Sequence, residues 1–411
     1  MKRSTSNLLT THAGSLPRPD EILAGAGADA AHLKQAVSDI VRRQADTGID
    51  IVDDGELSKP SFITYVRERL DGITPAGTLR GALWGKSRDA RAFPAFYSKQ
   101  VGVAGQPNYD CTGPLSYKGQ AYLQADLDNL KVAVGAAKVA EAFVPSISPA
   151  NIESWHANKY YKTDEEYRTA LCDAMRVEYK AIVDAGFILQ VDDPRLVTYY
   201  MMNPDLSLKD IRKWASMQVE ALNYALRGIP AEKIRYHTCY SVNMAPRVGD
   251  MPAKDILDII LKIKAGAFSF EASNPRHEHE WTVWRDAKKP DGTILIPGVV
   301  THASVLVETP ELVAERLVKY ANFAGKENII AGTDCGFATF ASADEIDPAI
   351  AWAKLDALAK GAEMASKQLR ARPAKPAPRR AAAKKPVRGS RKTVAKKTRK
   401  TPGRAKKRAR R

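Results

Sequence analysis

The feature that most constrains the fold of this 411-residue chain is a regular alternation of short apolar runs with longer amphipathic stretches. Short apolar runs bounded by Gly, Pro or Asp are typical of buried strands, and apolar positions three or four apart are typical of helices. Eight strands are predicted, at residues 8–14, 49–53, 142–147, 187–193, 234–240, 268–272, 294–300 and 328–335. Most are followed by a predicted helix, and the helices cover residues 31–47, 125–141, 164–185, 207–226, 253–264, 310–324 and 348–369.

This rhythm predicts the α/β fold class, as a parallel (β/α)8 barrel of the TIM type. Residues 72–120 break the rhythm and are rich in Gly, Pro and aromatic residues. We expect them to form an irregular insertion after the second strand, with a hairpin and covering loops. An open, doubly wound sheet is the alternative, although the chain has no glycine-rich phosphate loop to mark its switch point.

The positive charge of the chain is concentrated at its C-terminal end. Residues 368–411 contain 20 Lys and Arg and no Asp or Glu, whereas the remaining 43 basic residues are opposed by 47 acidic ones. The last segment also lacks apolar periodicity, so it cannot bury enough surface to offset the entropy of ordering. We therefore predict a barrel at residues 1–366 and a disordered Lys/Arg/Ala/Pro-rich tail at residues 367–411. Such a tail is expected to bind nucleic acid or other polyanions non-specifically, or merely to keep the protein soluble.

Cysteine usage and hydropathy indicate the compartment. Four cysteines are too few for a disulfide scaffold in a chain of this length, which favours a reducing environment. The N-terminal residues lead into no apolar signal region, and no apolar run approaches 18 residues. The sequence predicts a cytoplasmic protein with no membrane association.

A candidate metal site is encoded at the ends of three predicted strands. His237 and Cys239 are two residues apart on one strand, so their side chains project from the same face. Glu271 and Cys335 end two later strands, and strand ends converge at the carboxyl face of a barrel. Alone, a His-x-Cys pair is more often core packing. One imidazole, two thiols and one carboxylate together match zinc in chemistry and in number.

Several short motifs resemble those of the cobalamin-independent methionine synthases, in their C-terminal catalytic barrel. The resemblance covers about residues 8–365, and the motifs occur in the family's order. They are Thr11-His12-Ala13-Gly14-Ser15-Leu16-Pro17, Asp54-Gly55-Glu56, Gln190-Val191-Asp192-Asp193-Pro194, His237-x-Cys239, Glu271, Pro297-Gly298-Val299-Val300-Thr301-His302 and Cys335.

The resemblance implies roles for these residues. Gly14 and Ser15 are expected to contact the carboxylate and amine of homocysteine, while Glu56 and Asp192 bind the amine. The four zinc ligands would be His237, Cys239, Glu271 and Cys335, and His302 would be the catalytic histidine.

The chemistry of these residue types agrees with thiol alkylation. Coordination to zinc deprotonates a thiol at neutral pH, where a free thiol with a pKa of about 8.5 is mostly protonated. His302 is the candidate that delivers a proton to the leaving atom. The predicted function is zinc-dependent transfer of a methyl group from a methyl donor to a small-molecule thiol, homocysteine, to form methionine.

Departures from the family leave alternatives open. The chain has no room for the second barrel of the long form, which puts a folate donor in question. Asp193 stands where the family has glutamate, and the segment before His302 is one residue shorter. The compact form also resembles epoxyalkane:coenzyme M transferases, so alkyl transfer to another thiol is one alternative. A nucleic-acid-associated protein that acts through its tail is another.

A polar segment after Glu271 has no assigned role. His277 and His279 are candidates for additional metal ligands, or for binding an anionic substrate group together with Arg276. A solvated charged loop is the competing interpretation.

Overall fold

The computed structural model describes residues 1–23, 29–99, 104–241, 244–341 and 346–371. Its central sheet has eight strands in the order β1-β11-β10-β9-β8-β7-β5-β2, and every neighbouring pair is parallel. A parallel bridge from Thr11 to Ile51 joins the two ends of the sheet. The predicted (β/α)8 barrel is therefore confirmed, and the open-sheet alternative is wrong. The strands are β1 (Leu9–Thr10), β2 (Ile51–Val52), β5 (Glu141–Ile147), β7 (Ile188–Asp192), β8 (Ile234–Thr238), β9 (Ala267–Glu271), β10 (Ile294–Val300) and β11 (Ile330–Thr333).

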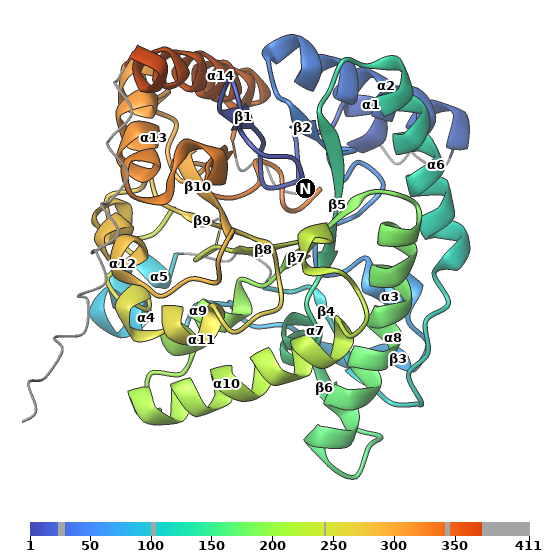
Figure 1. The fold of residues 1–411 in the computed structure, drawn as a ribbon. Helices are drawn as coiled ribbons and strands as arrows, with labels where there is room; N and C mark the ends of the chain where they lie inside the picture. Colours follow the sequence, from blue (N-terminus) through green and yellow to red (C-terminus); the bar gives the residue numbers. More distant parts are fainter. Residues whose placement is uncertain (24–28, 100–103, 242–243, 342–345, 372–411) are drawn as a thin grey trace, which may run out of the picture. The chain divides into compact units, whose positions relative to one another are not determined.

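Long helices surround this barrel (Figure 1). They are α2 (Ala30–Thr47), α6 (Gln120–Ala136), α8 (Asp164–Asp184), α10 (Leu208–Ala225), α13 (Pro310–Ala324) and α14 (Pro348–Ala371). Local signals set several of their ends. Thr163 and Glu166 form a capping box at the start of α8, and Gly48 ends α2 with a φ of 92°. Shorter elements are α1 (Asp20–Leu23), α12 (Trp281–Asp286), η2 (Ala231–Lys233), η4 (Glu278–Glu280) and η5 (Lys326–Asn328).

Two predicted helices differ from the structure. The helix expected at residues 125–141 is α6, which begins and ends five residues earlier because Glu141 already belongs to strand β5. The helix expected at residues 253–264 is only a 3-10 turn, η3 (Ala253–Asp255), and a short helix, α11 (Leu257–Ile260). Ile256 interrupts the segment with a φ of −137°.

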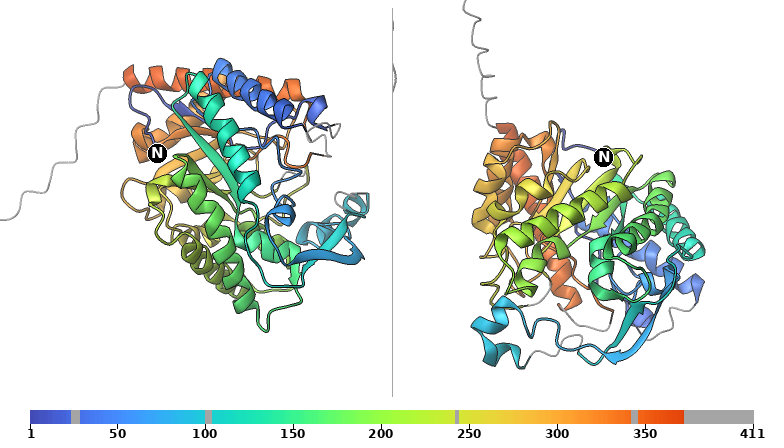
Figure 2. Two further views of the ribbon diagram at one scale, coloured as in Figure 1. Left: turned by 90° about the vertical axis from the view of Figure 1, so that its right-hand side faces the viewer. Right: turned by 90° about the horizontal axis from the view of Figure 1, so that it is seen from below.

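The insertion after the second strand is a small layer of its own (Figure 2). Strands β3 (Ile73–Leu79) and β4 (Pro107–Cys111) form an antiparallel pair, and β6 (His156–Asn158) lies parallel to β4. Short helices α3 (Val66–Arg69), α4 (Arg88–Ala92) and α5 (Pro94–Tyr97) complete it. The predicted hairpin is confirmed. Because the insertion begins at the carboxyl end of β2, it lies on the face where a barrel carries its site.

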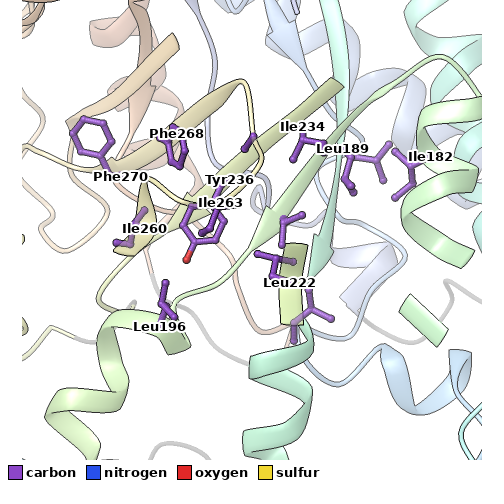
Figure 3. Packing of buried hydrophobic residues seen from close by; sticks show 14 of the residues in the cluster. Ile182, Leu189, Leu196, Leu222, Ile234, Tyr236, Ile260, Ile263, Phe268 and Phe270 are labelled. Carbon is purple, nitrogen blue, oxygen red and sulfur yellow. The ribbon is translucent and has the colours of Figure 1, made fainter. Parts of the chain in front are cut away.

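Alternate residues of the strands face two separate cores. Leu189, Tyr236 and Phe268 pack against helix residues such as Ile182 and Leu222 (Figure 3). A smaller cluster fills the inside of the barrel, with Ile51, Phe143, Ile188, Ala267, Ile294, Ile296 and Ile330. The same alternation directs the side chains of residues at the carboxyl ends of the strands into the mouth.

The predicted tail stays a prediction, since residues 372–411 lie outside the described residues. Helix α14 extends to Ala371, five residues past the predicted end of the barrel. In the described ranges, no helix combines the length and the apolar character needed to cross a membrane.

Candidate metal centre and active site

A pocket at the carboxyl ends of the strands, called the main pocket below, contains most of the predicted site residues. Residues that follow β1, β2, β5, β7, β8 and β11 line it together with side chains of the insertion. The lining residues are Ala13, Ser15, Glu56, Phe62, Ile63, Leu83, Trp84, Asn151, Trp155, Asp192, Pro194, Arg195, Thr198, Met202, His237, Cys239, Ser241, Cys335, Gly336, Thr339 and Phe340. The lining thus combines polar and charged side chains with apolar ones, here called the apolar wall, of which Phe62, Trp84, Trp155 and Phe340 are aromatic.

Three of the four predicted metal ligands converge in this pocket. The ligand atoms of His237, Cys239 and Cys335 all lie within 4.8 Å of one another, and the two sulfur atoms are 3.1 Å apart. All three side chains are buried. Strand β8 ends at Thr238, so Cys239 is the first residue beyond the strand, and Cys335 follows β11. The predicted convergence of strand ends brings them together.

The His237 ring is prepared for one further partner. Its Nδ1 atom is 3.0 Å from the Ser269 hydroxyl, which fixes the ring, while its buried Nε2 atom has no hydrogen-bond partner among the described residues. Burial lowers the pKa of His237 to about 3, helped by the charge of Arg235, so the imidazole is neutral and its free nitrogen is a lone-pair donor. A neutral imidazole nitrogen and two sulfur atoms fit zinc.

The two thiols favour a cation between them. The contact with Cys239 and burial together raise the pKa of Cys335 well above its usual value. Two adjacent buried thiolates would repel each other strongly unless a positive ion compensated them. The donor chemistry therefore suits a resident divalent metal.

Glu271 lies outside this group of three. Its carboxylate accepts hydrogen bonds from Arg247 Nη1 at 2.7 Å, from the backbone N–H of Tyr240 at 2.7 Å and from Asn274 Nδ2 at 2.6 Å. Burial raises the pKa of Glu271, but Arg247, His302, His277 and the hydrogen bond from Tyr240 together outweigh burial and hold the pKa below its usual value. The carboxylate is thus ionised and occupied by other partners, and its place as the fourth ligand stays a prediction.

Asp334 connects the loops that follow β9 and β11. It accepts hydrogen bonds from the backbone N–H groups of Ala272 and Ser273 at 2.7 and 3.1 Å, and from the Ser273 hydroxyl at 2.7 Å. Gly298 leaves room for it, since a Cβ atom there would lie 2.4 Å from Asp334 Oδ1. The backbone that carries Glu271 is therefore fixed relative to the neighbour of Cys335.

Glu56 and Asp192 are two buried carboxylates that line the same pocket as the metal group. Burial and the charge of Glu56 raise the pKa of Asp192 well above its usual value. Gln190 donates to Asp192 at 2.7 Å, and Lys59 donates to Glu56 at 3.2 Å and to the Pro145 carbonyl at 2.7 Å. Two carboxylates that share one pocket attract a cationic group.

The predicted Gly14-Ser15 loop lies beside this pair. Gly14 has a φ of 131°, and a Cβ atom on it would lie 2.7 Å from Glu56 Oε1. Ser15 lines the pocket, and its carbonyl accepts from the backbone N–H of Phe337 at 2.9 Å. The loops after β1 and β11 are therefore interlocked.

His302 lies near the metal group, although it is not among the described residues that line the pocket. Its Nε2 atom is 3.1 Å from the carbonyl of Ser241, and its Nδ1 atom has no partner among the described residues. Burial lowers the pKa of His302 to about 4, so the ring is neutral at pH 7.

The histidines after Glu271 are placed differently from each other. Both ring nitrogens of His277 are occupied, Nδ1 by Glu280 at 2.9 Å and Nε2 by Asp250 at 3.1 Å, and the ring stacks on Tyr240. His277 is therefore engaged in an internal ion-pair network, and His279 is exposed in η4.

Backbone strain is concentrated around the pocket. Among the described residues, the non-glycine residues with positive φ are Glu56 at 55°, Ser241 at 95° and Arg247 at 55°. Glu56 and Ser241 line the pocket, and Arg247 binds Glu271. Such strain persists where the surrounding structure enforces it, typically at functional sites.

The aromatic residues of the apolar wall were not predicted from the sequence. Phe62 and Trp84 belong to the insertion, and Trp155 ends α7 (Pro149–Trp155), where no periodic pattern marks them. Arg195, the first residue of α9 (Arg195–Met202), was also not identified, although it follows the Asp192 motif directly. A charged residue just after a predicted strand is the sequence signal that could have identified Arg195 as a candidate site residue.

The protein is a closed (β/α)8 barrel that carries one imidazole, two thiols and a pair of carboxylates in a pocket at its mouth. A barrel protein of this class is suited to bind a soft metal cation, through the imidazole and thiols, next to a positively charged group of a substrate. Comparisons with known proteins specify the class further. The family model of the cobalamin-independent synthase catalytic domain matches residues 148–354. The chain therefore belongs to the cobalamin-independent methionine synthase family, a family of methyltransferase enzymes.

Individual relatives agree with this membership. The methionine synthase of Sulfolobus acidocaldarius is 26% identical over 342 residues, which cover 80% of this chain and 85% of that protein. The methionine synthase of Thermococcus kodakarensis is 26% identical over 344 residues, covering 82% and 85%. A solved B12-independent methionine synthase from Shewanella sp. W3-18-1, in complex with selenomethionine, has the same fold, with a TM-score of 0.66, 21% identity and coverage of 89% and 99%.

Proposed function

We propose that this protein is a zinc-dependent S-methyltransferase that transfers a methyl group to the thiol of homocysteine and forms methionine. The observation that carries the proposal is the convergence of His237, Cys239 and Cys335 in the same pocket as Glu56 and Asp192. The methionine synthases to which this chain is similar support the choice of thiol.

The carboxylate pair gives the pocket its selectivity for an amino acid. We place the α-ammonium group of homocysteine between Glu56 and Asp192, where it relieves their mutual repulsion. The loop at Gly14 and Ser15 contacts the α-carboxylate. A homocysteine held in this way directs its thiol toward Cys239 and Cys335 on the facing wall.

The transfer needs a thiolate and a proton for the leaving group. His237, Cys239, Cys335 and, in this proposal, Glu271 would hold the zinc, which would lower the pKa of a substrate thiol and so supply the thiolate nucleophile. The apolar wall excludes water from the reacting atoms. In the proposal His302 supplies the proton, which requires its pKa to rise when substrates bind, and the negative charge of Glu271 already favours the charged ring.

Metal analysis tests the proposed site. We expect the purified protein to contain about one zinc per chain and Cys239→Ser and Cys335→Ser to lose most of it. Cys172→Ser is the matched control, because that buried thiol donates to the Ala221 carbonyl on α10 and is distant in sequence from the group. A native protein without metal, or equal zinc content in all three variants, would refute the zinc site.

A transfer assay tests the reaction separately. Zinc-loaded protein is incubated with homocysteine or 2-mercaptoethanesulfonate and a series of methyl donors, and methylated thiol is quantified. We expect methionine to form and Glu56→Gln to raise the KM for homocysteine by roughly 10- to 100-fold, because a buried charge-assisted contact is lost. Turnover of the sulfonate thiol alone, unaffected by Glu56→Gln, would favour the alkyl-transfer alternative.

A further inference from the structure

Arg195 is a charged residue in the main pocket that the proposed mechanism does not use. It is the first residue of α9, which begins three residues after Asp192. It lines the pocket together with Glu56, Asp192 and His237. The next residue, Leu196, is buried in the core and anchors the start of the helix (Figure 3). The position of Arg195 is therefore set by the barrel.

The guanidinium of Arg195 has no counterion in the described structure. No described residue forms a hydrogen bond or ion pair with it, and its buried Nε atom is unpartnered. Its contact is with the ring of Tyr199, whose centroid is 5.2 Å away and which stacks on Trp214. Burial lowers the pKa of Arg195 to about 10, so it still carries its charge at neutral pH.

Asp193 and Glu153 act electrostatically on Arg195, but the hydrogen bonds of both carboxylates go to other groups. Asp193 accepts from Asn151 Nδ2 at 3.0 Å and from the backbone N–H of Leu196 at 3.2 Å. Glu153 forms two hydrogen bonds with Arg168, at 2.7 and 3.0 Å. A largely buried, unpaired charge is costly, and buried charges are normally paired. The missing partner is expected to arrive with a ligand.

We propose that Arg195 binds the acidic group, a carboxylate or sulfonate, of a small molecule that occupies this pocket. The proposal rests on the proposed function in that the ligand is either the thiol acceptor or the alkyl donor. Glu56 and Asp192 select a cationic group at one end of the pocket, and Arg195 selects an anionic group at another. The planar guanidinium matches the geometry of two acceptor oxygens.

Binding of matched ligand pairs tests this role. Calorimetric titrations of the zinc-loaded, full-length protein compare homocysteine with 3-aminopropanethiol, 2-mercaptoethanesulfonate with 2-mercaptoethanol, and 5-methyltetrahydrofolate with its glutamate diamide. Each pair differs in its acidic group. We expect that removing the acidic group weakens binding by about 10- to 100-fold in at least one pair. The responding pair identifies whether acceptor or donor carries the group.

Variants assign the effect to Arg195. In the responding pair, Arg195→Gln should reduce the affinity for the acidic ligand to that of the ligand without the acidic group. The affinity for the ligand without the acidic group should not change, and Arg195→Lys should retain part of the affinity for the acidic ligand. Arg285→Gln, an exposed arginine paired with its neighbour Asp286, controls for loss of charge. Equal weakening of both members, or no pair that depends on its acidic group, would overturn the proposal.

Stability gives an independent readout that needs no ligand. Because the charge is unpaired in the free protein, Arg195→Gln should leave the Tm unchanged or raise it by a few degrees. A clear fall in Tm would mean that Arg195 stabilises the fold and would contradict the proposal. The protein could also fail to form methionine and still bind one ligand pair in an Arg195-dependent way. That result would refute homocysteine as the acceptor and would support the anion site at Arg195.

Discussion

Gly14 is the residue whose backbone is most tightly tied to the proposed substrate site. Its φ of 131° is unfavourable for any residue with a side chain, and a Cβ atom would meet Glu56 Oε1 at 2.7 Å and Pro145 Cγ at 3.1 Å. We expect Gly14→Ala to lower the free energy of unfolding by about 1–3 kcal/mol. It should also displace Glu56 and weaken homocysteine binding.

Urea denaturation and calorimetric titration measure these effects. Gly135→Ala is the matched control: Gly135 lies inside α6 with nothing within 4 Å of a Cβ atom, so alanine there should stabilise by about 0.5–1 kcal/mol. Equal stability changes in the two variants would contradict the proposed tight fit at Gly14.

His277 predicts a pH dependence of stability. Burial disfavours its charged form, but hydrogen bonds to Asp250 and Glu280 outweigh burial and raise the pKa of His277 to about 9. Since this folded-state pKa lies above the unfolded value of about 6.5, the contribution is complete below pH 6.5 and is lost as the pH rises through 9. It amounts to up to about 3 kcal/mol.

Urea unfolding at pH 6, 7.5 and 9.5 tests this contribution. The free energy of unfolding of the wild type should fall toward that of His277→Gln across this range, so that the two curves approach each other. Parallel curves would show that His277 is not protonated in the folded protein.

At the scale of elements, Thr163 and Glu166 form the capping box at the start of α8, because Thr163 precedes the helix and Glu166 occupies the third helical position. Thr163→Ala should lower the free energy of unfolding by about 1–2 kcal/mol. Thr47→Ala is the control, since Thr47 is partly buried in the last turn of α2 and its hydroxyl donates to the Arg43 carbonyl rather than capping a helix start. Denaturant titration distinguishes them, and equal effects would refute the capping role.

Apolar runs located all eight barrel strands, because buried parallel strands need such runs whatever surrounds them. A continuous helix was wrongly predicted at residues 253–264, because Ile256, Ile259, Ile260 and Ile263 follow helical spacing. All four are buried, yet η3, α11 and the turns beside them achieve this burial without a continuous helix. Spacing identifies the buried face, and the backbone form depends on tertiary packing.

The site was predictable where it depends on strand ends and unpredictable where it depends on the insertion. His237, Cys239 and Cys335 follow from barrel geometry alone. Trp84 and Arg247 depend on loop conformation, which no periodicity encodes. Glu271 shows the limit clearly: its position at the end of β9 was predicted, and its pairing with Arg247 was not.

At the scale of the whole molecule, the basic C-terminal segment should be separable from catalysis. We expect a chain ending at Ala371 to keep methyl transfer within about twofold, because the described pocket uses no residue beyond Phe340. Binding to DNA, measured by fluorescence anisotropy, should be lost with the segment, and in the full chain it should weaken steeply with added salt. Loss of turnover on truncation would favour the nucleic-acid alternative over the enzyme.

The seam of the barrel has a consequence for the order of folding. It joins β1 to β11, and Ala13 and Thr333, which form a hydrogen bond across it, are 320 positions apart. Closing so long a loop carries the largest entropic penalty among the pairings of this sheet. His237, Cys239 and Cys335 need only strands from the second half of the chain, whereas Ser15 meets Gly336 only after closure. We therefore expect the refolding chain to be able to hold the proposed metal before it can recognise the proposed amino-acid substrate.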